Sequence, residues 1–165
     1  MSKPIELNNL YDFYVIRLNG LPIFAGCSGT DYCQGHVAQH QLHAGFFSAL
    51  YAFANEAFQD VRLETIYFDK IQMNLLISES DNIMIIFVHH RSKSLQKIRE
   101  LMNQTWEIFK QDYIPKLKEN QFQKDLYKAF LEDLKKLKVI LPDKDPFDIR
   151  EMLLEGLKNR KIPAQ

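Results

Sequence analysis

Apolar residues recur at helical spacing between residues 43 and 58, HAGFFSALYAFANEAF. They occupy positions i, i+1, i+4, i+7, i+11 and i+12, which together form one broad face of a helix. These positions hold Phe46, Phe47, Leu50, Phe53, Ala57 and Phe58. We therefore predict a helix over about residues 41–59. Because this helix would have to bury four phenylalanines, it requires a sheet beneath it.

Two strands are predicted before this helix. Residues 11–18 (YDFYVIRL) are rich in aromatic and β-branched residues, which favour strands. Asn19 and Gly20 follow, and both residue types tolerate positive φ at low cost. They predict a hairpin turn into a partner strand at residues 21–25.

Three more strands are predicted after the helix. Residues 61–69 and 71–77 each show alternating character, as strands with two unlike faces do. Residues 83–88 (IMIIFV) are continuously apolar, which indicates a central strand covered on both faces. Such a strand requires a second layer of helices on the far side of the sheet.

The C-terminal third supplies that second layer. Ser94 can cap a helix that ends before Pro115, and residues 117–138 form an amphipathic helix with a leucine and phenylalanine face. Asp145 and Pro146 then open a last short helix. We predict one domain over residues 1–138 and a helical extension over residues 139–165.

The element order β-β-α-β-β-β-α predicts an α/β (α+β) fold with a five-stranded, mostly antiparallel sheet between helices. Over about residues 11–137, this order and the apolar placement resemble the longin domain of the longin/roadblock, profilin-like superfamily. Longin domains occur in trafficking SNAREs, adaptor small subunits and small-GTPase regulators. The roadblock relatives normally open with a helix, for which the polar residues 5–10 (IELNNL) leave little room.

The resemblance implies a non-catalytic module that binds a small GTPase or another longin or roadblock subunit, as a homodimer or heterodimer. The assembly would serve vesicle trafficking or small-GTPase regulation. Alanines widen the apolar surface of the predicted helix, and the strand at residues 63–68 lies at a sheet edge with open hydrogen-bonding groups. We predict partner binding through Phe47, Tyr51, Asn55, Tyr67 and Phe68. Alternatively, the chain's own C-terminal helix fills the groove between these elements, and the two interpretations do not exclude each other.

Composition narrows the function classes. Lys+Arg and Asp+Glu both number 21, so no net charge attracts nucleic acid or an anionic membrane. No stretch reaches the ~18 consecutive apolar residues of a membrane span, and the N-terminus lacks the pattern of a secretory signal. We expect a cytoplasmic protein that reaches membranes only through its partners. Neither GxGxxG nor GxxxxGK[ST] occurs, and no nucleophile, base and orienting group form a catalytic set, so we do not expect an enzyme.

One loop contains residue types that bind metals. Cys27, Cys33, His36 and His40 have the spacing C-x5-C-x2-H-x3-H, and thiolate with imidazole suits zinc. Structural zinc sites usually begin with a shorter C-x2-4-C spacing, so we predict no metal and no cofactor. The alternative function is a small-molecule or metal sensor that combines the loop at residues 27–43 with His89 and His90 at the end of the central strand.

Overall fold

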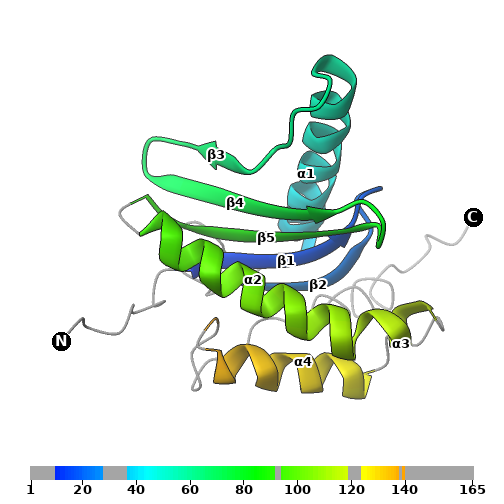
Figure 1. The fold of residues 1–165 in the computed structure, drawn as a ribbon. Coiled ribbons are helices and arrows are strands. Elements are labelled where there is room, and N and C mark those ends of the chain that lie inside the picture. Colours follow the sequence, from blue (N-terminus) through cyan, green and yellow to red (C-terminus); the bar gives the residue numbers. More distant parts are fainter. Residues whose placement is uncertain (1–9, 28–36, 92–93, 119–123, 138, 140–165) are drawn as a thin grey trace, which may run out of the picture.

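The computed structural model describes residues 10–27, 37–91, 94–118, 124–137 and 139. Nine helices and strands lie within these ranges (Figure 1). The strands are β1 (Leu10–Arg17), β2 (Pro22–Cys27), β3 (Thr65–Tyr67), β4 (Ile71–Ser78) and β5 (Ile83–His90). The helices are α1 (Val37–Ala57), α2 (Leu95–Asp112), α3 (Ile114–Lys118) and α4 (Lys124–Lys136).

The strands form one five-stranded sheet in the order β2-β1-β5-β4-β3, and every neighbouring pair is antiparallel. The β1–β2 hairpin turns at Gly20, which has φ +88° and donates its N–H to the Arg17 carbonyl at 2.8 Å. β5 lies in the middle of the sheet, and its side chains from Ile83 to Val88 are buried on both faces. The predicted hairpin and the predicted central strand are therefore confirmed.

One face of the sheet is covered by α2, α3 and α4. Figure 1 shows α2 running along this face, with α4 packed beside it. Phenylalanine rings join the two layers: Phe130 of α4 lies 5.1 Å from Phe24 of β2 and 5.2 Å from Phe109 of α2, measured between ring centroids. Phe13 and Phe87 continue this core along β1 and β5.

Among the described helices, α1 alone covers the other face. Ala44 and Phe47 are the α1 residues in its core, where they pack against Tyr14 and Ile16 of β1 and Met84 of β5. Figure 1 shows α1 standing steeply against the sheet, so that its C-terminal end points away from the strands. Among the described residues, few buried side chains pack against this half of α1.

Two predicted elements are built differently in the structure, and a third is not described. The strand predicted at residues 61–69 is reduced to β3, because Asp60 adopts a left-handed φ of +58° and the chain only reaches pairing distance of β4 near Glu64. The helix predicted at residues 117–138 is present as the separate helices α3 and α4. The helix predicted after Pro146 lies outside the described residues, so the extension at residues 139–165 stays a prediction. Among the helices that the structure describes, none is long and apolar enough to cross a bilayer.

Candidate protein-interaction surface

The close contact between α1 and the β1–β2 hairpin decides which side of α1 faces the sheet. A Cβ atom on Gly20 would lie 3.2 Å from the Cβ of Ser48, and Ser48 Oγ donates a hydrogen bond to the Leu18 carbonyl at 2.6 Å. Ala44 is buried one turn earlier on the same side. Small side chains therefore allow α1 to approach the hairpin, and the opposite side of the helix is left facing outward.

The outward side of α1 is apolar. Leu42, Phe46 and Phe53 recur at i, i+4 and i+11, which places them on one face of the helix, roughly opposite Ala44, Phe47 and Tyr51. Phe46 is 44% exposed and Phe53 is 60% exposed. Phe58 continues the apolar surface beyond the helix end, because its ring lies 6.2 Å from the Phe53 ring, and Val61 is exposed three residues further along the chain. We call these residues the α1 apolar surface: Leu42, Phe46, Phe53, Phe58 and Val61.

This arrangement corrects the prediction that α1 buries four phenylalanines. Only Phe47 enters the core, where it is 1% exposed, whereas Phe46, Phe53 and Phe58 remain at the surface. Phe47 was also a predicted partner-binding residue, and its buried ring offers no surface to a partner. In the sequence, the spacing of Leu42, Phe46 and Phe53 indicates the exposed side, because these residues lie on a different face of the helix from Phe47.

The other predicted binding residues fall into two groups. Tyr51 is half-buried and donates a hydrogen bond to Glu79 Oε1 at 3.1 Å, and Asn55 is exposed one turn later. Burial, assisted by the Glu79 carboxylate, raises the pKa of the Tyr51 phenol. Tyr51 and Asn55 both line a cavity of about 300 Å³ between α1 and the β4–β5 turn.

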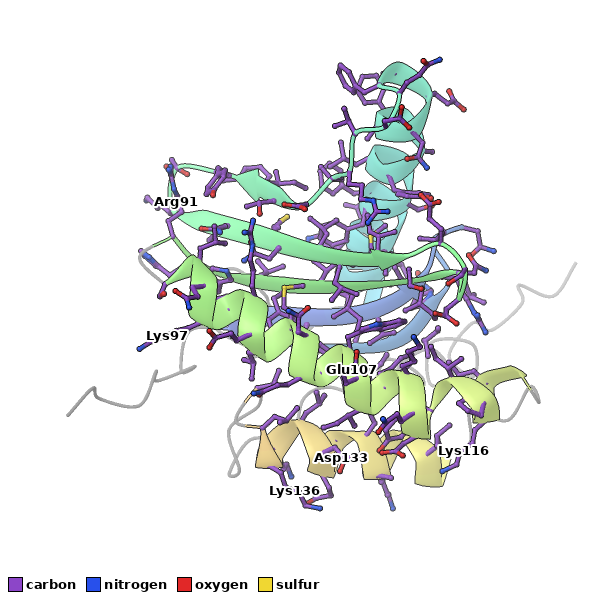
Figure 2. The ribbon with its side chains drawn as sticks, viewed as in Figure 1. Arg91, Lys97, Glu107, Lys116, Asp133 and Lys136 are labelled. Atoms are coloured by element: carbon purple, nitrogen blue, oxygen red, sulfur yellow. The ribbon has the colours of Figure 1, made fainter. Side chains whose placement is uncertain are left out.

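Tyr67 and Phe68 form the second group, at the opposite end of β4. Both are exposed, and the Arg91 guanidinium lies 5.3 Å from the Tyr67 ring centroid and donates a hydrogen bond to the Phe68 carbonyl at 3.1 Å. Figure 2 shows Arg91 at the end of the sheet that lies away from α1. Tyr67 pairs with Gln72 near the start of β4, whereas Tyr51 contacts Glu79, just after its end. The length of β4, about 20 Å, therefore separates the two groups. The five predicted residues therefore do not form one surface.

The predicted sensor residues lie largely outside the described part of the chain. Cys33 and His36 are outside it, and the side chains of Cys27 and His40 are likewise not described. Among the described residues, no group of three metal-ligating side chains occurs. The metal prediction therefore stays untested.

The two histidines at the end of β5 are placed differently. His89 is 1% exposed, its ring contacts the Asn74 amide, and its Nδ1 lies 2.8 Å from the His90 carbonyl. Gln72 and Thr65 complete this buried polar cluster through hydrogen bonds to Asn74 Oδ1, both at 3.1 Å. His89 thus belongs to the packing beneath α2, whereas His90 is half-buried at the strand end.

Comparisons with known proteins identify relatives in structure only. No protein-family model matches the sequence, and no curated protein matches it. The solved structure of Myxococcus xanthus MglB is similar at 15% identity, covering 60% of this chain and 78% of that chain, with a TM-score of 0.44. The Roadblock/LC7 domain from Streptomyces avermitilis is similar at 18% identity, covering 51% and 68% of the two chains, with a TM-score of 0.39. By its own element order and sheet order, the chain has the longin-like α/β fold that the sequence predicts.

Proposed function

We propose that this chain is a non-catalytic protein-interaction module of the longin type and that it binds its partner through the α1 apolar surface. The observation that supports this proposal is the exposure of three phenylalanines, Phe46, Phe53 and Phe58, together with that of Leu42 and Val61. Contiguous apolar surface of this kind marks interaction sites on soluble domains. Aromatic side chains that become buried at the centre of an interface carry most of its binding energy.

This surface can contribute to the binding energy of a complex. Complete burial of an exposed phenylalanine contributes about 1.5–3 kcal/mol, of which these partly exposed rings can supply a part, and a 1.4 kcal/mol difference corresponds to a tenfold change in affinity. Two of these rings, Phe53 and Phe58, already contact each other edge-to-face at an interplanar angle of 86°. A partner therefore meets a partly ordered pair of rings, which lowers the entropy cost of binding.

The class of partner comes from the family resemblance of the sequence. We propose a small GTPase, or a second longin or roadblock subunit, which includes a second copy of this chain. The complex would act in a membrane-trafficking or GTPase-regulating assembly in the cytoplasm. Any contact with a membrane would then be made through the partners.

Co-purification tests this proposal. The chain is co-expressed with small GTPases and with longin or roadblock chains from the same genome, and its own mass is measured at several concentrations. We expect at least one stable pair, which the double variant Phe53→Ser, Phe58→Ser loses. The matched control is Gln104→Ser, an exposed position on α2.

Two results would contradict the proposal. One is a strictly monomeric chain that co-purifies with none of these proteins. The other is a complex that the double variant retains at full strength, although circular dichroism shows both variants to be folded.

A further inference from the structure

A second cavity lies on the α2 side of the sheet, away from the α1 apolar surface. Its volume is about 240 Å³, and its walls come from β4, from α2 and from the residues just before β3. None of the described α1 residues lines it. Because drug-sized ligands occupy sites of ~300–1,000 Å³, this cavity suits a smaller molecule.

Asn74 contributes a buried polar side chain to the cavity wall. It is 2% exposed, and its Oδ1 accepts two hydrogen bonds, from Thr65 Oγ1 and Gln72 Nε2. On the other side of the amide, Nδ2 contacts Nε2 of His89. Because Nδ1 of His89 lies 2.8 Å from the His90 carbonyl and donates to it, Nε2 is the acceptor. These contacts fix which way the Asn74 amide points.

The fixed amide retains one unused donor. The Asn74 nitrogen carries two hydrogens, of which the contact with His89 uses one. In the described part of the chain, no acceptor pairs with the second. Buried N–H groups in folded proteins are nearly always paired, because leaving one without an acceptor is unfavourable. Since Asn74 lines the cavity, a ligand there can supply the missing acceptor.

The charged side chains around the cavity favour an anion of single charge. Arg62, Arg99 and Glu64 are the charged residues that line it, so the lining has one net positive charge. Glu64 already pairs with Arg99 at 3.3 Å. Arg62 has no ion-pair partner among the described residues. Its planar guanidinium can bind a carboxylate through two parallel N–H groups.

The rest of the cavity wall is largely apolar. Met102 of α2 is 3% exposed, and Leu76 of β4 is half-buried and packs against the core of the α2 face. Both line the cavity. A hydrocarbon chain is removed from water by such walls, whereas a hydrophilic ion gains nothing from them. The cavity therefore favours an anion that carries an apolar chain.

We propose that this cavity binds a small monocarboxylate with a short apolar chain. Arg62 and the second N–H of Asn74 hold the carboxylate, and the chain packs against Leu76 and Met102. The inference goes beyond the proposed function and does not depend on it, because the cavity and the α1 apolar surface share no residue.

NMR of the ¹⁵N-labelled full chain tests the proposal with one probe and three control compounds. The probe is 4-methylpentanoate. Its uncharged counterpart, 4-methylpentanamide, tests the need for the carboxylate, and acetate tests the need for the chain. Inorganic phosphate tests whether any anion suffices. The side-chain amide signals of Asn74 report contact with the carboxylate, and the backbone amides of Leu76 and Met102 give the dissociation constant.

We expect 4-methylpentanoate to shift the Asn74 side-chain amide signals and to bind at about millimolar concentration, as a small ligand in a half-open site does. Each control compound should bind at least about fivefold more weakly, because it lacks either the charge or the buried chain. Unshifted Asn74 side-chain signals, or binding of any control compound as tight as that of 4-methylpentanoate, would overturn the inference.

A pair of substitutions tests the role of Arg62. Arg62→Gln removes the charge of an exposed side chain that has no ion-pair partner among the described residues, so the fold should be kept. It should weaken 4-methylpentanoate binding at least about threefold. Lys97→Gln is the matched control: it makes the same charge change on α2, where Figure 2 shows Lys97, at a residue that does not line the cavity. Equal binding by the two variants would also overturn the inference.

The variant Phe53→Ser, Phe58→Ser separates this inference from the proposed function. Neither residue lines the cavity, so the variant should bind 4-methylpentanoate like the unaltered chain. If the compound fails to bind the unaltered chain while the variant still loses its protein partner, the carboxylate site is wrong and the α1 interface stands. If the compound binds and the variant loses no partner, the α1 interface is wrong and the carboxylate site stands.

Discussion

The two faces of the sheet differ in how completely the described residues cover them. On the α2 face, rings from strands and helices meet in a continuous core; Phe130, for example, contacts Phe13, Phe24, Phe109 and Tyr113. On the α1 face, α1 is the one described helix, which contributes Phe47 and Ala44, and several strand side chains are only partly buried. The partly buried strand residues are Ile66, Ile71, Met73 and Ile77.

The strands themselves do not cause this difference. β5 supplies Ile83, Ile85 and Phe87 to one face, while Met84 and Ile86 face the other, so both faces are apolar. What differs, in the part of the chain that the structure describes, is the covering layer: three helices on one side, and on the other a helix that leans away and exposes its own phenylalanines. The more fully covered face stabilises the domain, and the less covered face is the one through which we propose recognition.

The largest expected effect is on the complete face. Phe130→Ala removes a fully buried ring from the junction of α4 with α2 and β2, and it should lower the free energy of unfolding by about 3–5 kcal/mol. Urea unfolding followed by circular dichroism measures this free energy. The control Phe130→Leu keeps most of the volume and should cost much less; equal losses in both variants would argue against close packing here.

A smaller effect is expected at the equivalent position on the incomplete face. Phe47→Ala should cost about 3 kcal/mol, at the low end for a buried ring, because the sparse layer around α1 can relax into the space. The same urea experiment applies. A loss as large as that of Phe130→Ala would show that the two faces are packed equally well.

The hydrogen bond between Tyr113 and Asp133 joins α4 to the end of α2 and adds a pH dependence to the complete face. The phenol donates to Asp133 Oδ2 at 2.6 Å, and Figure 2 shows Asp133 on α4. Burial, followed by the hydrogen bond and charge of Asp133, raises the pKa of the Tyr113 phenol above its usual range. Tyr113→Phe should cost about 1 kcal/mol at pH 7.

The sign of the pH effect follows from that raised pKa. The folded state holds the phenol proton more tightly than the unfolded state, whose tyrosines titrate near pH ~10. The stability advantage over Tyr113→Phe is therefore complete below about pH 10 and should fall by up to about 1.4 kcal/mol per pH unit above it. Urea unfolding of the unaltered chain and of Tyr113→Phe, between neutral and alkaline pH, measures the difference in their free energies of unfolding. The other tyrosines are present in both proteins and therefore do not affect this difference. A constant difference would contradict the assignment.

The smallest effect on stability is expected at the α1 apolar surface. Phe53→Ala truncates an exposed ring and should change the free energy of unfolding by less than about 0.5 kcal/mol. The thermal unfolding midpoint of Phe53→Ala, compared with that of Phe47→Ala, tests this expectation. A destabilisation similar to that of Phe47→Ala would mean that Phe53 is packed within the chain and is not available to a partner.

Most of the sheet could be predicted from the sequence, because its signals are local. The turn at Asn19 and Gly20 and the apolar run at residues 83–88 each specify one arrangement, and the structure has both. Ser94 is likewise the N-cap residue of α2, although its side chain makes no capping hydrogen bond.

The exposed side of α1 could not be predicted in the same way. Phe46 and Phe47 are adjacent, and the alanines make several sides of the helix equally suited to burial, so periodicity alone does not choose between them. The choice is made by the close approach of Gly20 to Ser48, a contact between residues 28 positions apart. The shortness of β3 could not be predicted for a similar reason: residues 61–64 alternate like a strand, but they follow the left-handed φ of Asp60, and of their backbone groups the Glu64 carbonyl is bonded to β4, at Leu75.

Site-specific photo-crosslinking at position 53 tests the central claim most directly. A benzophenone amino acid replaces Phe53 in the full chain, in the cells that produce it, and Gln104 on α2 serves as the control position. If the α1 apolar surface is a protein interface, irradiation yields a discrete adduct at position 53 that is absent at position 104, and mass spectrometry identifies the partner. No adduct at position 53, or equal adducts at both positions, would contradict the account.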